Sequence, residues 1–267
     1  MAIGGSTMRF GGRVALVTGA ASGIGRASAS MIARGGALVG CLDCDEGHLR
    51  EVVREIDARG ATALPLVADV SDAAAVDAAV AGLVERGGRL DIVVASAGIN
   101  GVWGPIDEIE PAEWDHTIDV NLKGTFLTLK HATPHLRARG GAVVIVSSGQ
   151  GTRSFTQPGS HAYACSKAAQ AVLAKKLALE LARHKVRVNV VCPGSTYTNI
   201  NASGVRRSMD KITLPIEYPD GKVLLKEGRK GEPEQVARLV SFLVSDDADL
   251  ISGSEVWIDG TMSLVMG

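Results

Sequence analysis

Ala142-Val143-Val144-Ile145-Val146 is an unbroken apolar run, rich in β-branched residues, in a chain of 267 residues. A strand without alternating polar side chains suits a sheet that other elements cover on both faces. Similar short runs occur before and after it along the chain. Together with the run at 142–147, they predict strands at residues 13–18, 37–42, 61–67, 90–95, 186–192 and 254–258.

Longer amphipathic stretches separate these runs and have the apolar spacing of helices. They predict helices at residues 23–34, 46–59, 73–86 and 162–183. Strands that alternate with helices indicate βαβ units and a parallel sheet. The expected fold is a single-domain α/β structure, a Rossmann-like doubly wound sheet of about seven parallel strands with helices on both faces. Ligands of such folds bind outside the carboxyl ends of the strands, so functional residues should directly follow the strands.

The bulk composition indicates a small-molecule partner. The chain has 28 lysines and arginines against 29 aspartates and glutamates, a net charge of −1, so no global field favours nucleic acid or an anionic membrane. No apolar run approaches the roughly 18 residues of a membrane-spanning helix, and residues 1–8 are expected to be a flexible leader without the apolar stretch of a signal peptide. We therefore expect a cytoplasmic protein.

No metal site is expected. Cys41 and Cys44 have the spacing of a zinc or redox pair, but the other two cysteines are isolated and supply no second pair. His131 and His135 are spaced as in helical zinc sites, yet no third ligand is evident nearby and Pro134 is expected to disturb the helix. We therefore expect ordinary surface or core roles for these residues.

The turn after the first predicted strand contains three glycines, in Thr18-Gly19-Ala20-Ala21-Ser22-Gly23-Ile24-Gly25. Glycines let the backbone approach a pyrophosphate, and the N-terminus of the following helix offers unpaired N–H donors and a partial positive charge. The spacing differs from the commoner Gly-x-Gly-x-x-Gly pattern, so a plain glycine-rich turn is the alternative. The functional reading is the phosphate-binding half of a dinucleotide site.

Asp43 follows Gly25 at close to the roughly 20-residue offset at which an acidic side chain binds the adenine ribose. A carboxylate accepts both ribose hydroxyls and repels a 2′-phosphate. Even a fraction of the ~4 kcal/mol between unit charges about 4 Å apart exceeds a tenfold preference. Because neither Ser22 nor Cys44 is a cation that offsets this repulsion, we expect NAD rather than NADP. The alternative is a solvated acid at a strand end.

Ser148 follows the strand predicted at 142–147, and Tyr163 and Lys167 lie one helical turn apart in the helix predicted at 162–183. Residues at this spacing share one helix face. A free tyrosine has a pKa of about 10, and a neighbouring ammonium lowers it by favouring the phenolate. We interpret Tyr163 as an acid/base group tuned by Lys167. Packing and solvated surface are the alternative for such a pair.

Taken in order, these motifs resemble the classical short-chain dehydrogenase/reductase family over about residues 13–260. The resemblance adds Asn121, in Val120-Asn121-Leu122-Lys123-Gly124, to the catalytic positions Ser148, Tyr163 and Lys167. It implies that the cofactor is held by Thr18, Gly19, Ser22, Gly23, Ile24, Gly25, Asp43, Asp69, Val70, Ala97, Gly98, Tyr163, Lys167, Pro193, Gly194 and Thr198.

The resemblance also implies a role for each catalytic side chain. Ser148 hydrogen-bonds the substrate oxygen, and Tyr163 removes its proton during oxidation while hydride passes to the nicotinamide. Lys167 holds the nicotinamide ribose, and Asn121 anchors a water that links this lysine to solvent. One departure is Ala95-Ser96-Ala97-Gly98, where the family has Asn-Asn-Ala-Gly, and it puts in doubt a hydrogen bond that stabilises the sheet.

Residues 195–231 lack a regular period but contain many apolar side chains, so we interpret them as a substrate lid within one NAD-binding oxidoreductase domain at residues 9–267. An ordinary surface insertion is the alternative. Trp103, Gln150 and Phe155 are candidate substrate contacts.

The expected activity interconverts a secondary alcohol (a polyol, sugar, hydroxylated ring or hydroxyacyl compound) and its ketone, with NAD as cofactor. A non-catalytic dinucleotide sensor of the same fold is the alternative, and the intact set of Ser148, Tyr163 and Lys167 argues against it. A sugar-nucleotide epimerase is disfavoured because it normally carries a larger C-terminal domain. Similar proteins are mostly tetramers, so we expect a homotetramer or dimer with contacts through helices in residues 111–139 and 162–184.

Overall fold

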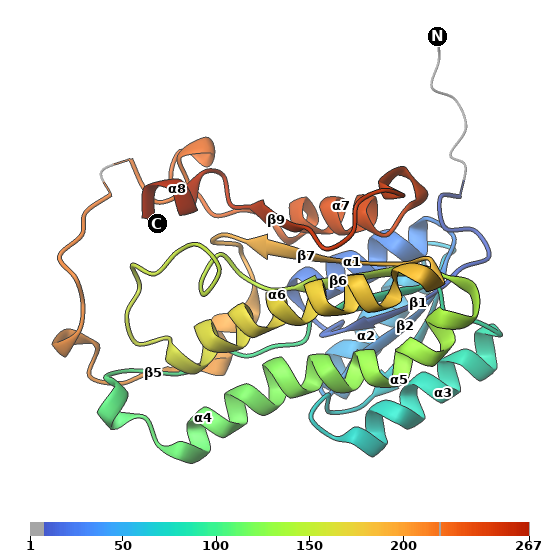
Figure 1. Ribbon diagram of the computed structural model, residues 1–267, viewed down its shortest axis with the longest axis horizontal. Helices are drawn as coiled ribbons and strands as arrows, with labels where there is room; N and C mark the ends of the chain where they lie inside the picture. Colours follow the sequence, from blue (N-terminus) through green and yellow to red (C-terminus); the bar gives the residue numbers. More distant parts are fainter. Residues whose placement is uncertain (1–7, 219, 267) are drawn as a thin grey trace, which may run out of the picture.

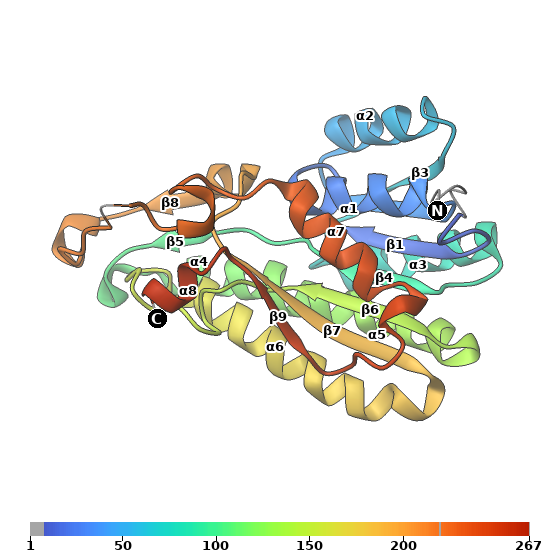
Figure 2. The ribbon, with the colours of Figure 1, turned by 90° about the horizontal axis from the view of Figure 1, so that it is seen from above.

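The structure is a computed structural model that describes residues 8–218 and 220–266. Residues 1–7 of the predicted leader lie outside the described residues. The central element is a parallel sheet of seven strands in the order β3-β2-β1-β4-β6-β7-β9 (Figures 1 and 2). The strands are β1 (Val14–Thr18), β2 (Leu38–Asp43), β3 (Thr62–Val67), β4 (Ile92–Ala95), β6 (Gly141–Val146), β7 (Val186–Pro193) and β9 (Glu255–Ile258).

Helices cover both faces of this sheet (Figures 1 and 2). Helices α1, α2 and α7 share one core cluster with the sheet, and α3, α5 and α6 share the other. The helices are α1 (Gly23–Arg34), α2 (Glu46–Asp57), α3 (Ala73–Gly87), α4 (Pro111–Ile118), α5 (Gly124–Arg139), α6 (His161–Leu181), α7 (Pro233–Leu243) and α8 (Met262–Met266).

The apolar run in β6 explains why helices cover both faces of the sheet. Ala142, Val144 and Val146 belong to the core cluster of α1, α2 and α7, whereas Val143 and Ile145 belong to the opposite cluster. Successive side chains of a strand point to opposite faces, so an unbroken apolar run needs an apolar partner on each side. The predicted doubly wound fold is confirmed, and the ends of all seven predicted strands differ from the structure by only one or two residues.

A second, two-stranded parallel sheet lies outside the main one. It pairs β5 (Gly101–Trp103), from the connection after β4, with β8 (Gly204–Arg206), from the segment after β7. Both strands are too short to show a period in the sequence, and neither was predicted. Their pairing attaches the segment predicted as a lid to the loop that follows β4.

Strands β1 and β4 are neighbours in the sheet although β2 and β3 separate them in the chain. The chain leaves β1 toward α1 on one face, and the order of strands reverses at this point, so a crevice forms at the carboxyl ends. In residues 8–218 and 220–266, no helix combines the length and apolar character needed to cross a membrane.

Candidate active site

A cavity of about 730 Å³ lies at the carboxyl ends of the parallel strands. Most of the predicted site residues line it, namely Gly19, Ser22, Gly23, Ile24, Gly25, Asp43, Asp69, Val70, Ala97, Gly98, Trp103, Ser148, Gln150, Tyr163, Lys167, Pro193, Gly194 and Thr198. Thr18, Asn121 and Phe155 are not part of this lining. The structure therefore brings together two groups of residues, one beside α1 and one beside α6.

The turn between β1 and α1 requires its glycines for close packing. Gly19 has a φ of +67°, and a Cβ atom there would lie 2.9 Å from the backbone of Ala97. A Cβ atom on Gly25 would lie 2.0 Å from the carbonyl oxygen of Gly19, and one on Gly23 would lie 3.1 Å from the methyl carbon of Thr198. Larger residues at these positions would displace the turn.

The first turn of α1 is suited to an anion. Ser22 is the N-cap residue, yet its side chain makes no capping hydrogen bond, and the first turn contains no acidic residue. The N–H groups of a first helical turn have no partner inside the helix and carry the positive end of the helix dipole. Because Ser22, Gly23 and Ile24 line the cavity, this turn fits the pyrophosphate of a dinucleotide.

Asp43 is held beside the same turn at the end of β2. One carboxylate oxygen accepts a hydrogen bond from the backbone N–H of Ala21 at 3.0 Å, and the other accepts one from Asp45 N at 3.0 Å. Asp69 also lines the cavity, and its Oδ1 accepts bonds from the backbone N and the hydroxyl of Ser71, each at 2.8 Å. This end of the cavity therefore carries negative charge and suits hydroxyl donors.

Thr18 lies behind the lining and ties two strands together. Its hydroxyl oxygen accepts hydrogen bonds from Ser96 N at 3.1 Å and Ala97 N at 3.2 Å. The departure from the family pattern at residues 95–98 put a sheet-stabilising hydrogen bond in doubt. In this chain Thr18 supplies two such bonds between the ends of β1 and β4.

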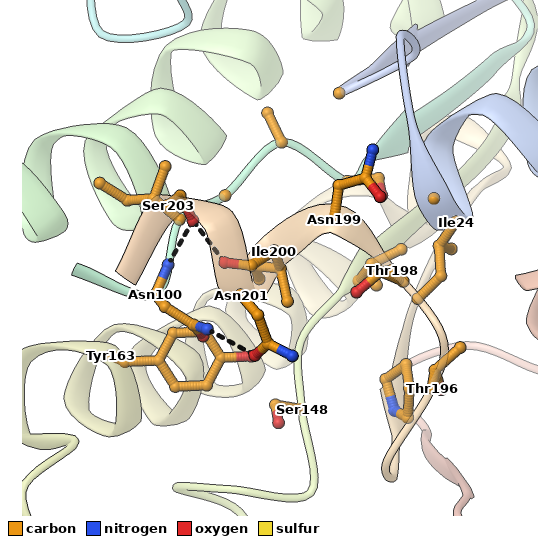
Figure 3. A pocket seen from close by; sticks show the side chains of 18 of the residues that line it. Ile24, Asn100, Ser148, Tyr163, Thr196, Thr198, Asn199, Ile200, Asn201 and Ser203 are labelled. Atoms are coloured by element: carbon orange, nitrogen blue, oxygen red, sulfur yellow. Dashed lines mark hydrogen bonds between the residues drawn. The ribbon is translucent and has the colours of Figure 1, made fainter. Parts of the chain in front are cut away.

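Tyr163 and Ser148 both line the cavity, and both are shown in the close view of Figure 3. Burial raises the pKa of Tyr163 above its usual range, and a hydrogen bond with Ser148 partly opposes this rise. The net pKa of Tyr163 is raised rather than lowered as expected, because burial outweighs the attraction of the Lys167 ammonium, whose nitrogen lies 5.6 Å from the ring centre. Tyr163 is therefore protonated at neutral pH.

Lys167 is almost completely buried, and its ammonium is directed at two acceptors. The Nζ donates to the carbonyl oxygen of Val146 at 3.0 Å and to Oε1 of Gln170 at 3.2 Å. Burial lowers the pKa of Lys167 to about 8. Since an ammonium has three donors, one N–H remains for a ligand in the cavity that Lys167 lines.

Asn121 lies in a π-helical turn (Asp119–Lys123) between α4 and α5 and is fully buried. Its Nδ2 donates to the carbonyl oxygen of Ile99 at 3.0 Å and to Ser166 Oγ at 3.1 Å, and its Oδ1 accepts from Ile99 N at 2.8 Å. Asn121 therefore fastens the loop after β4 to α6. π-helical turns of this kind are frequent at functional sites.

Gln170 joins Asn121 to Lys167 directly. Its Nε2 donates to the carbonyl oxygen of Asn121 at 2.7 Å, while its Oε1 accepts from Lys167. The family resemblance implies that Asn121 anchors a water that links Lys167 to solvent, and in this structure the buried amide of Gln170 joins the two residues. Sequence reasoning missed Gln170, although its position three residues after Lys167 on the same helix face was available as a signal.

The predicted substrate contacts have different positions. The Trp103 ring lies 6.4 Å from the Tyr163 ring, centre to centre, at an interplanar angle of 43°. Gln150 lines the cavity, and its Oε1 is buried without a hydrogen-bond partner in the described part of the chain. Phe155 is 70% exposed and outside the cavity lining, so the structure does not support its predicted contact.

Residues 195–231 contribute much of the cavity wall opposite α6. Asn100 hydrogen-bonds Asn201 and Ser203, and Figure 3 shows these groups in the same part of the pocket as Tyr163. Sequence reasoning predicted this segment as a lid without identifying its individual contacts. The lining residues that it missed here and in neighbouring loops include Asn100, Gln157, Asn199, Ile200, Asn201, Ser203, Arg206, Lys222, Lys230 and Met262.

The histidines and cysteines considered above as metal ligands have ordinary core and surface positions. Pro134 does not end the helix in which it lies, because α5 continues through it to Arg139. His131 on α5 contacts Asp77 of α3 at 2.8 Å. Cys41 is buried and Cys44 exposed, and both are free thiols.

Comparisons with known proteins agree with this geometry. A family described as "Enoyl-(Acyl carrier protein) reductase" matches residues 19–263. A curated relative, the 3-oxoacyl-[acyl-carrier-protein] reductase FabG of Thermotoga maritima, is 34% identical, with 95% of this chain and 98% of the relative covered. The cis-4-hydroxycyclohexanecarboxylate dehydrogenase of Sinomonas cyclohexanicum is 37% identical over 96% of this chain and 98% of its own length.

Solved structures give the same assignment. A 3-ketoacyl-ACP reductase from Sinorhizobium meliloti 1021 is 51% identical and superposes with a TM-score of 0.91, covering 94% of this chain and 99% of the other. A 3-ketoacyl-(acyl-carrier-protein) reductase from Brucella melitensis, complexed with NADH, is 32% identical with a TM-score of 0.83, covering 95% and 99%. The chain therefore belongs to the classical short-chain dehydrogenase/reductase family of oxidoreductases.

Proposed function

We propose that this protein is an NAD(H)-dependent oxidoreductase that interconverts a secondary alcohol and its ketone, with Tyr163 as the general acid/base. The candidate alcohols are a polyol, a sugar, a hydroxylated ring or a hydroxyacyl compound. The observation that carries the proposal is that Tyr163 and Ser148 line the same cavity, with the buried ammonium of Lys167 5.6 Å from the centre of the tyrosine ring.

The preference for NAD rests on Asp43. Its carboxylate is held by two backbone N–H groups next to the glycine turn, where it accepts ribose hydroxyls and repels a 2′-phosphate. Structural relatives include both a complex with NADH and a complex with NADP, so the choice between these cofactors depends on local residues. A nicotinamide dinucleotide bound here supplies or accepts the hydride.

The residues of the chain handle the proton. In reduction, Ser148 donates a hydrogen bond to the carbonyl oxygen and Tyr163 transfers its proton to the same oxygen as negative charge develops there. The Lys167 ammonium stabilises the phenolate that remains. Because the pKa of Lys167 is about 8, reduction should slow as the pH rises through 8 and this charge is lost.

Three further features belong to the proposal. Residues 195–231 act as a substrate lid in a single domain at residues 9–267. The protein forms a homotetramer or dimer through α4, α5 and α6, which is supported by exposed apolar side chains such as Phe126 on α5 and Leu179 on α6. It works in the cytoplasm.

The proposal is tested with a panel of alcohols and ketones, followed by the absorbance of reduced nicotinamide with NAD and NADP in parallel. We expect turnover of at least one secondary alcohol or ketone and a preference for NAD. Tight dinucleotide binding without turnover of any compound would instead support the alternative function, a non-catalytic dinucleotide sensor. Preference for NADP would contradict the role of Asp43.

A further inference from the structure

The small sheet outside the main fold places a cation beside the active tyrosine. Strands β5 and β8 pair in parallel with Trp103 opposite Arg206. The backbone N–H of Arg207 donates to the carbonyl oxygen of Trp103 at 2.8 Å just beyond the last pair. This register determines which side chain of β8 lies next to Trp103.

Arg206 stacks on the tryptophan. Its guanidinium carbon lies 5.0 Å from the centre of a Trp103 ring, and that side chain is in turn the aromatic neighbour of Tyr163. Arg206 also lines the cavity. A guanidinium that stacks through its face keeps the N–H donors at its edge free for a planar anion.

The neighbouring cations are neutralised, but Arg206 is not. Arg207 forms an ion pair with Glu113, and Lys211 forms one with Glu108. Across residues 8–218 and 220–266, no carboxylate lies within ion-pair distance of Arg206. Its charge is therefore available to a ligand in the cavity.

The charges of the cavity are divided between its two ends. Its lining carboxylates, Asp43 and Asp69, lie at the end beside β2. The other cations of the wall opposite α6, Lys222 and Lys230, stack on Tyr218 and Tyr197. Arg206 is thus the cation that shares an aromatic side chain with the catalytic tyrosine.

We propose that Arg206, stacked on Trp103, binds a carboxylate of the substrate. The substrate class is then a hydroxy acid or keto acid whose carboxylate lies several bonds from the reacting carbon. Two parallel N–H···O bonds from the guanidinium match the two oxygens of a carboxylate. This inference rests on the proposed function, because it names the substrate class of the same site.

The test compares 4-oxocyclohexanecarboxylate with its methyl ester, which has the same ketone without the charge. With the wild-type protein, we expect kcat/KM for the acid to exceed that for the ester by about tenfold or more, the usual effect of a charge-assisted hydrogen bond. Arg206→Gln should remove this preference, mainly through KM, while leaving the ester within about twofold. Arg206→Lys should retain part of the preference, and Arg238→Gln, an exposed arginine on α7, should retain all of it.

Equal turnover of acid and ester by the wild type, or an equal loss for both in Arg206→Gln, would overturn the inference and leave the proposed function intact. Failure to turn over any carbonyl compound or alcohol would contradict the proposed function itself. In that case calorimetric titration of 4-oxocyclohexanecarboxylate into wild-type and Arg206→Gln protein still decides the matter, since equal or absent binding counts against Arg206. A parallel assay uses a 3-oxoacyl thioester of coenzyme A, whose phosphates are the alternative anion for Arg206. If Arg206→Gln lowers kcat/KM only for this thioester, Arg206 binds the phosphates of coenzyme A rather than a carboxylate, and the proposal is refuted.

Discussion

The two walls of the cavity are built on different principles. On the side of α6, the polar groups of Asn121, Lys167 and Gln170 are buried and satisfy one another. On the opposite side, residues 195–231 present apolar side chains such as Leu214 and Leu225 to solvent. A buried network in which every group has a partner is rigid, whereas a segment with exposed apolar side chains has less packing to hold it.

This difference corresponds to the two tasks of the site. Proton transfer requires atoms to be held within a fraction of an ångström, and the buried network provides that precision. Substrate selection requires a wall that can vary without disturbing the sheet, and loops are the elements that tolerate such variation. Substitutions on the two walls should therefore have effects of different size and kind.

The largest effect is expected at Tyr163. Tyr163→Phe removes the proton that is transferred, so kcat should fall by about 10² to 10⁴-fold. Dinucleotide binding, measured by fluorescence titration, should weaken far less than kcat falls, because the glycine turn and Asp43 are untouched. Tyr197→Phe, on the opposite wall, is the matched control and should keep full activity. Substantial turnover by Tyr163→Phe would refute the assignment of the acid/base group.

A smaller effect is expected at the cofactor end. Asp43→Ser removes the charge that repels a 2′-phosphate, so the ratio of the Kd values for NADP and NAD should change by about tenfold or more toward NADP. Asp249→Ser, which replaces an exposed acid far along the chain, controls for the change in net charge. An unaltered ratio in Asp43→Ser would show that another group selects the cofactor.

A shift in pH dependence is expected at Gln170. Gln170→Leu removes an acceptor from the Lys167 ammonium, which disfavours the charged form and lowers a pKa already near 8. A hydrogen bond to a charged group contributes about 1.5–3 kcal/mol. In a plot of the reduction rate against pH, the alkaline fall in rate should therefore occur about one to two pH units lower.

Gln170→Glu distinguishes this positioning role from mere packing. The glutamate carboxylate stabilises the charged form of Lys167, so the alkaline fall in the reduction rate should occur at higher pH. If both variants lose activity equally at every pH, Gln170 only supports the fold. Circular dichroism on both proteins monitors that possibility.

The smallest effect is expected for stability on the exposed wall. Leu225 is 78% exposed, so Leu225→Ala should change the free energy of unfolding by no more than about 0.5 kcal/mol. The same substitution at Leu16, fully buried in β1, should cost about 2–5 kcal/mol. Urea denaturation measures both. A comparable loss for the two would mean that residues 195–231 are packed as firmly as the sheet.

The parts predicted from the sequence are those that depend on local patterns. Strand boundaries followed from apolar runs, and the positions of Gly19, Asp43 and Ser148 followed from the ends of those strands. The β5–β8 pair was missed because a three-residue strand leaves no periodic signal. Gln170 was missed because its spacing from Lys167 shows a shared helix face but not the hydrogen bond to Asn121. The pKa of Tyr163 was misjudged because its burial depends on surrounding elements, whereas the spacing to Lys167 suggested only attraction.

The sequence by itself therefore determined the doubly wound sheet, the glycine turn and the catalytic spacing on α6, since each arises from contacts between near neighbours or from the repeating period of an element. Only the tertiary structure decided that a buried Gln170 joins Asn121 to Lys167, that burial raises the pKa of Tyr163, and that Arg206 lies across Trp103. These outcomes depend on segments distant in the chain meeting at one edge of the sheet, and no local pattern encodes the distances between them.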